Sequence, residues 1–302
     1  MNRREILCGT ATLLAGVLPG VPAAASDDPA LRKVGHGAAE GWAAIERGVH
    51  GRLGVAVLDT GSGTLSGHRL DERFPMCSTF KCLAAALVLA RVDAGQERLN
   101  RRVVVTRESL LEWSPVTSQH VDGAGMTMAE LCEAAVTVSD NPAANLLLQG
   151  VGGPAGLTAF LRRIGDDVTR LDRNEPTLNQ AVPGDPRDTS TPRAMARTLR
   201  TLLLGDALSA RSREQLLRWM AATTTGAKRL RAGLPADWKI ADKTGTGRLG
   251  TTNDVALLQP PHGAPLVVVA YLTQSKADAD ARERALAAVG RLVAGRGWRP
   301  AA

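Results

Sequence analysis

The chain has 302 residues, 44% hydrophobic and 22% charged, proportions that are ordinary for a soluble globular protein of one large domain or two packed lobes. A net charge of +7 could indicate a nucleic-acid partner, but the basic residues are scattered and aromatic residues make up only 3%, too few for base-stacking surfaces. The longest apolar run after the N-terminus, residues 82–90, is far too short to span a membrane.

The first 25 residues have the layout of an export signal. A short basic start, MNRRE, precedes the apolar stretch ILCGTATLLAGVL, and the small residues VPAAAS offer a cleavage site after Ala25. The arginine pair in this start resembles a twin-arginine signal. We therefore expect an exported, periplasmic protein, with a buried N-terminal helix as the alternative.

Strands predicted near both ends of the chain enclose a long helical section. Residues 52–70 predict a β-hairpin, residues 238–245, 252–260 and 264–274 predict three strands, and residues 278–295 predict a closing helix. Helical runs lie between them at residues 79–94, 127–138, 142–149, 154–164, 192–204 and 211–221. This order indicates an α/β (α+β) fold of two lobes. Residues 26–77 and 222–302 would form an antiparallel sheet flanked by helices, and residues 78–221 an all-helical lobe.

Ser78 and Lys81 lie three residues apart in the stretch MCSTFKC, at the start of a predicted helix. That spacing places both on one face, near the unsatisfied N–H groups of the helix N-terminus. The lysine could activate the serine as a nucleophile, although about one Ser-x-x-Lys is expected by chance in a chain this long. Cys77 and Cys82 compete as nucleophiles, but Cys77 has no assigned base and Cys82 faces apolar neighbours.

Two further polar motifs follow along the chain. The run SDN (139–141) lies on a turn between helices, where it could be a plain helix cap or supply a proton-relaying hydroxyl and a substrate-binding amide. The run DKTGTG (242–247) ends a predicted strand. Its lysine and two hydroxyls could hold a carboxylate, and Gly245 would let a substrate lie against the strand. A strand edge protected by a lysine is the alternative.

Residues 170–188, RLDRNEPTLNQAVPGDPRD, contain three prolines and many charges, which is typical of a long functional loop. Glu175 precedes a proline and should be extended, and Asn179 follows four residues later. Arg173 and Asp188 could tie the two ends of the loop together. A solvated charged loop is the alternative.

Other chemistries are less well supported. The run GTGRLG (245–250) fits a dinucleotide-binding pattern, but a strand follows it where a helix is required. No serine lies in Gly-x-Ser-x-Gly and no histidine pairs with a nucleophile, which argues against a Ser–His–Asp triad. No cysteine or histidine cluster has zinc spacing, so we expect no metal and no cofactor.

Ser-x-x-Lys, Ser-Asp-Asn and Lys-Thr-Gly, in this order, resemble the motif set of class A β-lactamases and penicillin-binding proteins. The runs WSPVTSQH, RLDRNEPTLN and DTSTPRAMARTL extend the resemblance to class A serine β-lactamases over essentially the whole mature chain. The resemblance implies hydrolysis of the β-lactam amide of penicillins and cephalosporins, which confers antibiotic resistance. It also implies a monomer that acts on small molecules.

The resemblance assigns catalytic roles. Ser78 would be the nucleophile, Lys81 or Glu175 the base for acylation, and Ser139 the donor of a proton to the lactam nitrogen. Glu175 and Asn179 would hold the water that hydrolyses the acyl-enzyme. The backbone N–H groups of Ser78 and Thr246 would form an oxyanion hole.

The resemblance also assigns substrate contacts. Lys243, Thr244 and Thr246 would bind the substrate carboxylate, Asn141 its side-chain amide, and Trp113 would stand as an aromatic gate. Many members use an arginine where this chain has Thr252 or Glu283, and Arg229 matches a third location that some members use. We therefore expect Arg229 to bind the carboxylate.

The cysteines and the alternatives remain open. Cys132 matches half of a disulfide common in the family, but the partner position is Ala85, so a bridge to Cys82 is only an option. A cysteine before the nucleophilic serine, here Cys77, resembles the carbapenem-hydrolysing members. In those members it usually forms a disulfide with a cysteine at the position that is Gly247 here, so this chain cannot form that bridge. A D-Ala-D-Ala carboxypeptidase or transpeptidase, or a β-lactam sensor that stays acylated, would share the three motifs but lack a deacylating pair such as Glu175 and Asn179.

Overall fold

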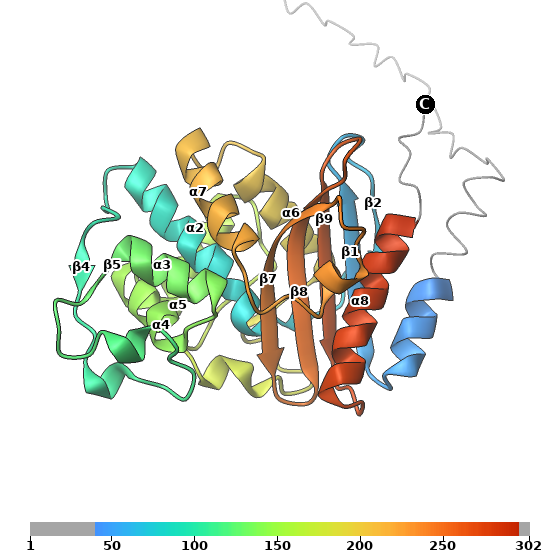
Figure 1. Cartoon of the computed structure of the whole chain (residues 1–302), viewed down its shortest axis with the longest axis horizontal. Helices are drawn as coiled ribbons and strands as arrows, with labels where there is room; N and C mark the ends of the chain where they lie inside the picture. Colours follow the sequence, from blue (N-terminus) through green and yellow to red (C-terminus); the bar gives the residue numbers. More distant parts are fainter. Residues whose placement is uncertain (1–39, 296–302) are drawn as a thin grey trace, which may run out of the picture.

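The computed structural model describes residues 40–295, and the expected export signal lies outside them (Figure 1). Its centre is an antiparallel sheet of five strands in the order β2-β1-β9-β8-β7. The strands are β1 (Arg52–Asp59), β2 (Leu65–His68), β7 (Lys239–Gly247), β8 (Thr251–Gln259) and β9 (Leu266–Thr273). The first and last thirds of the chain therefore pair directly, and the α/β class predicted from the sequence is confirmed.

Helices cover both faces of this sheet (Figure 1). The helix α8 (Ala279–Gly295) lies on one face beside a helix over residues 40–48 that the sequence did not predict. The remaining helices are α2 (Phe80–Asp93), α3 (Met128–Thr137), α4 (Asn141–Gly150), α5 (Gly153–Arg163), α6 (Pro192–Leu203) and α7 (Ala210–Ala221). Each of these lies within one residue of its predicted range. No helix among residues 40–295 combines the length and apolar character that a membrane crossing requires.

Shorter elements connect these parts. The two-residue strands β3 (Phe74–Pro75) and β6 (Thr189–Ser190) pair with each other, as do β4 (Arg102–Val103) and β5 (Met126–Thr127). Single-turn 3-10 helices are η1 (Cys77–Thr79), η2 (Arg107–Ser109), η3 (Thr117–Gln119), η4 (Thr177–Gln180) and η5 (Leu230–Gly233). The turn η1 runs directly into α2.

Strand β9 shows how the sheet divides two hydrophobic cores. Val267, Val269 and Tyr271 pack into the core formed with the helical section, whereas Val268 and Leu272 pack into the core under α8. Successive side chains of a strand point to opposite faces. Because both faces are covered, the run LVVVAYL (266–272) is apolar rather than alternating with polar residues.

Strand β7 and the turn η1 approach each other closely, and glycine permits this contact. A Cβ at Gly245 would lie 2.7 Å from the carbonyl oxygen of Met76, and one at Gly247 would lie 2.6 Å from Sγ of Cys77. Both distances are too short for a larger residue without displacement. The glycines thus bring the strand edge to the N-terminal end of α2, where the polar motifs meet.

The long loop over residues 170–188 is closed at its base by charge. Nε of Arg173 donates to Oδ2 of Asp188 at 2.5 Å, and Oδ1 of Asp188 accepts from the backbone N–H groups of Asp172 and Arg173. The expectation that Arg173 and Asp188 tie the loop together is confirmed. A paired, hydrogen-bonded carboxylate of this kind fixes the loop that carries Glu175.

Candidate active site

Ser78 lies in η1, at the junction of the helical section and β7. Its hydroxyl donates to Oε1 of Glu175 over 3.3 Å. Cys77, the residue before it, has φ of +47°, a left-handed conformation that costs a non-glycine residue on the order of 1–3 kcal/mol. The surrounding packing holds this turn and so fixes the direction of the serine side chain.

The amine of Lys81 lies one helical turn further, in a fully buried position surrounded by acceptors. It donates to Oδ1 of Asn141 at 2.6 Å and to the carbonyl oxygen of Ser139 at 2.8 Å, and it lies 3.1 Å from Oε1 of Glu175. Burial lowers the pKa of Lys81, although the neighbouring Glu175 carboxylate opposes this shift. A lowered pKa favours the neutral amine that a general base requires.

The SDN turn supplies the helix cap that the sequence offered as one of two interpretations. Asp140 is a helix cap, since its side chain accepts from the backbone N–H of Ala143 at the start of α4. Ser139 instead faces the lysines: its Oγ lies 3.3 Å from Nζ of Lys81 and 3.1 Å from Nζ of Lys243. The turn therefore holds the Ser139 hydroxyl between two amines.

Glu175 is held from two sides. Nδ2 of Asn179 donates to its Oε2 at 2.5 Å, within the loop. Asn145 of α4 bonds its backbone in both directions: Nδ2 donates to the Glu175 carbonyl at 3.0 Å, and Oδ1 accepts from the Glu175 N–H at 2.9 Å. The following peptide bond, to Pro176, is cis. Sequence reasoning missed Asn145, and its only signal was its place one helical turn after Asn141.

Lys243 lies on β7 and is fully buried. Its Nζ donates to Oγ of Ser139 and, at 3.0 Å, to the carbonyl oxygen of Thr244. Desolvation, together with the nearby positive charge of Lys81, lowers the pKa of Lys243 to about 7. Next along the strand, Oγ1 of Thr244 lies 2.5 Å from Oγ1 of Thr225.

A cavity of about 390 Å³ opens above these groups. It is lined by Ser78, Trp113, Ser139, Asn141, Asn179, Thr225, Arg229, Thr244, Gly245 and Thr246. Lys81, Glu175 and Lys243 lie behind the lining and are bonded to it. The structure thus brings together all twelve predicted site residues, and it adds Thr225, one of three consecutive threonines with no motif of their own.

Residues 39–296 match the Beta-lactamase enzyme family. Among individual proteins, the chain is 50% identical to β-lactamase CTX-M-8 from Citrobacter amalonaticus over 251 residues, which are 83% of this chain and 86% of that protein. It is 50% identical to β-lactamase OXY-2 from Klebsiella oxytoca over 249 residues, 82% of this chain and 86% of that one.

The fold agrees with these similarities. The solved structure of an ancestral class A β-lactamase (GNCA) superposes with a TM-score of 0.83 at 66% identity, covering 84% of this chain and 98% of that one. The chain belongs to the class A β-lactamase family. Among residues 40–295 of this β-lactamase, no group of three or more His, Cys, Asp or Glu side chains could hold a metal ion.

Arg229 gives this β-lactamase a buried cation at the strand edge. Its Nη1 donates to the carbonyl oxygens of Gly245 (2.9 Å) and Asn253 (2.7 Å), and its Nη2 donates to Oγ1 of Thr246 at 2.7 Å. Glu283, on the last helix, lies 3.8 Å from Nε of Arg229. These hydrogen bonds hold the guanidinium against β7, beside the cavity.

Trp113 lies at the rim of the cavity. Its side chain is exposed, with 54% of its surface accessible, but Nε1 donates to the carbonyl oxygen of Val138 at 2.9 Å. The backbone carbonyl of Trp113 accepts from the N–H of Asn141. An exposed indole with a fixed orientation can bound one side of a substrate site.

The three cysteines of the described chain are free thiols. Cys77, Cys82 and Cys132 are all buried, so the Cys82–Cys132 bridge that the sequence left open is absent. Burial raises the pKa of all three thiols, that of Cys82 to about 12. A thiol that remains protonated is a poor nucleophile, which argues against Cys77 and Cys82 in that role.

Proposed function

We propose that Ser78 is the nucleophile with which this class A β-lactamase hydrolyses the cyclic amide of β-lactams. The observation that supports this role is the single carboxylate oxygen, Oε1 of Glu175, that contacts both the Ser78 hydroxyl and the Lys81 amine. Either Glu175 or Lys81 can take the serine proton as the hydroxyl attacks the lactam carbonyl. The N–H groups of Ser78 and Thr246 stabilise the oxyanion.

Ring opening requires a proton on the lactam nitrogen, and we assign its delivery to Ser139. Its hydroxyl lies within 3.3 Å of both lysine amines, either of which can replace the proton that it gives away. Glu175 and Asn179, joined by their 2.5 Å hydrogen bond, then hold the water that attacks the acyl-enzyme. A carboxylate fixed by an amide and an amine is suited to accept the proton of that water.

We assign the substrate carboxylate to the edge of β7. Lys243, Arg229 and the hydroxyls of Thr244 and Thr246 converge there. Gly245 keeps this edge close to η1, Asn141 contacts the substrate side-chain amide, and Trp113 bounds the opening.

Glu175→Ala tests this assignment. Without the carboxylate, ring opening can proceed with Lys81 as base, but the ester persists because no group activates water. Intact-mass spectrometry after addition of a penicillin should show the variant carrying the added mass. Glu214→Ala, an exposed acid on α7, is the matched control and should stay unmodified at the end of turnover. Equal persistence of the acyl-enzyme in the unmutated protein would instead favour a sensor or a penicillin-binding protein.

We further propose that penicillins and early cephalosporins are hydrolysed well and carbapenems slowly. Trp113, Cys77, Arg229 and Thr246 together resemble the broad-spectrum members. Steady-state hydrolysis rates, measured on one drug of each class, test this substrate range. If imipenem acylates the enzyme but is not turned over, carbapenems are not substrates.

We also propose that the protein is exported through its N-terminal twin-arginine signal and acts as a periplasmic monomer. Replacement of Arg3 and Arg4 by lysine should retain the protein in the cytoplasm, as cell fractionation would show. Sedimentation of the mature protein measures its oligomeric state, and a dimer would contradict this part of the proposal.

A further inference from the structure

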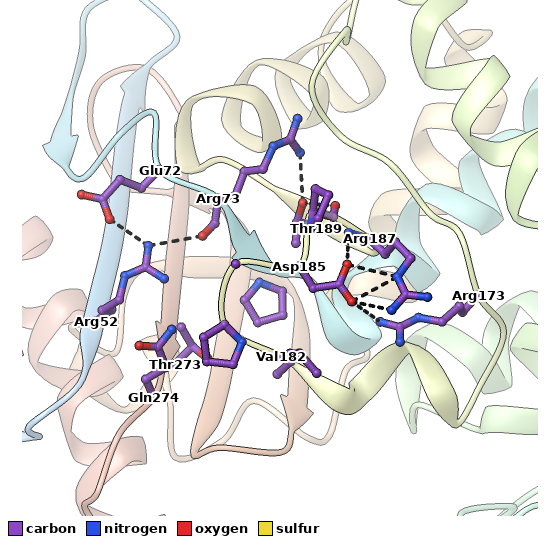
Figure 2. A pocket seen from close by; sticks show the side chains of 15 residues that line it. Arg52, Glu72, Arg73, Arg173, Val182, Asp185, Arg187, Thr189, Thr273 and Gln274 are labelled. Carbon is purple, nitrogen blue, oxygen red and sulfur yellow. Dashed lines mark hydrogen bonds and ion pairs between the residues drawn. The ribbon is translucent and has the colours of Figure 1, made fainter.

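A second cavity of about 270 Å³ lies against the outer side of the loop that carries Glu175 (Figure 2). We call it the arginine cavity, because Arg52, Arg173 and Arg187 line it together with the turn 182–185. It shares no lining residue with the catalytic cavity. Part of its lining, Arg173 and residues 181–187, belongs to the loop that the sequence predicted to be functional, but no role assigned from the sequence involves this cavity.

The charges around the arginine cavity do not balance. A fourth arginine of the lining, Arg73, donates to neutral oxygens, the carbonyl of Val168 and Oγ1 of Thr189 (Figure 2). The acids in the lining are Glu72 and Asp185. Arg52 pairs with Glu72, Arg187 with Asp185, and Arg173 with Asp188 at the base of the loop. Among residues 40–295 the charge of Arg73 therefore has no carboxylate partner, so the cavity favours an anion.

Two of these arginines keep hydrogen-bond donors available. Arg52 is held over the ring of Phe74, 4.6 Å from its centroid, and bonds Glu72 through Nη2 alone. Arg187 bonds Asp185 through Nε and Nη2. Within the described chain, Nη1 of each has no protein acceptor at hydrogen-bond distance. A guanidinium with free, fixed donors is a good partner for carboxylate or phosphate oxygens.

Part of the lining, the turn over residues 182–185, is preformed and offers apolar surface. The N–H of Asp185 bonds the carbonyl of Val182 at 3.2 Å, and Gly184, which follows Pro183, has φ of +80°. This arrangement is a β-turn with proline and glycine at its centre, a combination that restricts backbone motion. Val182 is half exposed beside it, so a ligand could place an apolar body here and its charge on the arginines.

We propose that the arginine cavity binds a small oxyanion, a carboxylate or phosphate group, and that the bound ion stabilises the loop over residues 170–188. Arg173 connects the two, since it lines the cavity and also holds Asp188 at the base of the loop. A ligand that binds only the folded protein raises its stability by mass action. This binding does not depend on the catalytic roles assigned above.

Two probes, inorganic phosphate and benzoate, test the proposal. Isothermal titration calorimetry and thermal unfolding are run in parallel, with chloride used to keep the ionic strength constant. We expect one saturable site and a higher melting temperature with at least one probe. Tighter benzoate binding indicates a carboxylate ligand with an apolar body, and tighter phosphate binding indicates a phosphate group.

Variants locate the site. Gln274 lines the cavity, so Gln274→Glu places a carboxylate there with almost no change of shape and should weaken binding roughly tenfold. Arg187→Ala removes a hydrogen-bond donor and should also weaken binding of the probe. Arg218→Ala on α7, outside the cavity, is the control and should bind the probes like the unmutated protein.

The proposal is wrong if neither probe binds beyond the chloride control. It is also wrong if Gln274→Glu binds normally, since the anion would then lie elsewhere, for example beside Lys243 and Arg229.

Discussion

Lys243 illustrates how burial alone changes the chemistry of one side chain. Its pKa is lowered to about 7, so in the folded protein the amine is charged only below that pH, whereas an unfolded lysine stays charged to about 10.5. Between these values the unfolded chain binds the additional proton. The contribution of this group to folding therefore becomes more favourable as the pH rises from 7 toward 10.5, while its ammonium charge is lost.

The same titration should appear in substrate binding. If Lys243 binds the substrate carboxylate, KM for a penicillin should rise as the pH increases above about 7, because the ammonium is lost. The bound carboxylate favours the charged amine and shifts this rise to somewhat higher pH. Steady-state kinetics from pH 6 to 10 measure it, with a carboxyl-esterified penicillin as the control. A KM that stays constant over this range would contradict the assigned contact.

At the scale of elements, the loop over residues 170–188 depends on α4 for its position. Asn145 supplies the acceptor and the donor that the Glu175 backbone uses. Asn145→Ala leaves both backbone groups without partners, which costs about 1–3 kcal/mol for each buried group. We expect slower deacylation with acylation less affected, because in the proposed mechanism the loop positions the hydrolytic water rather than the serine.

Rapid-quench kinetics separate these two steps for Asn145→Ala. Asn100→Ala, an exposed asparagine before β4, is the matched control and should leave both rates unchanged. Equal loss in acylation and deacylation would show that Asn145 supports the whole site rather than the loop.

The sequence predicted those elements whose pattern is local. The helices α2 to α8 have long periodic runs, and their ranges were predicted to within one residue. The helix over residues 40–48 was missed because it is short and is stabilised by packing, with Trp42 buried in the core under α8. Asn145 and Thr225 were missed for a related reason: each contacts a motif residue only after the chain has folded.

On the scale of the whole molecule, one sheet packs against two hydrophobic cores. A substitution that destabilises either core should therefore also affect the active site. Leu286 of α8 is fully buried in the core on the side away from the helical section. Leu286→Ala should lower the free energy of unfolding by about 2–5 kcal/mol through lost burial and a residual cavity. Because β7 and β8 belong to the same sheet, loss of activity on heating should coincide with unfolding.

Circular dichroism and residual activity, followed over one temperature series, test this coupling. Val104→Ala, at a residue with 63% exposure, should change stability by less than about 0.5 kcal/mol and serves as the reference. If the Leu286→Ala protein loses its helical signal in two separate steps and keeps its activity through the first, the two cores are independent.

The position of Ser139 between the two lysines determines the orientation of its hydrogen. A hydroxyl offers one hydrogen and two lone pairs. When both amines donate to its oxygen, at 3.3 Å and 3.1 Å, the lone pairs are occupied and the O–H bond is left to point elsewhere, into the cavity that Ser139 lines. If Ser139 delivers the proton to the lactam nitrogen, as we propose, a substrate entering the cleft would meet an O–H bond already directed toward it.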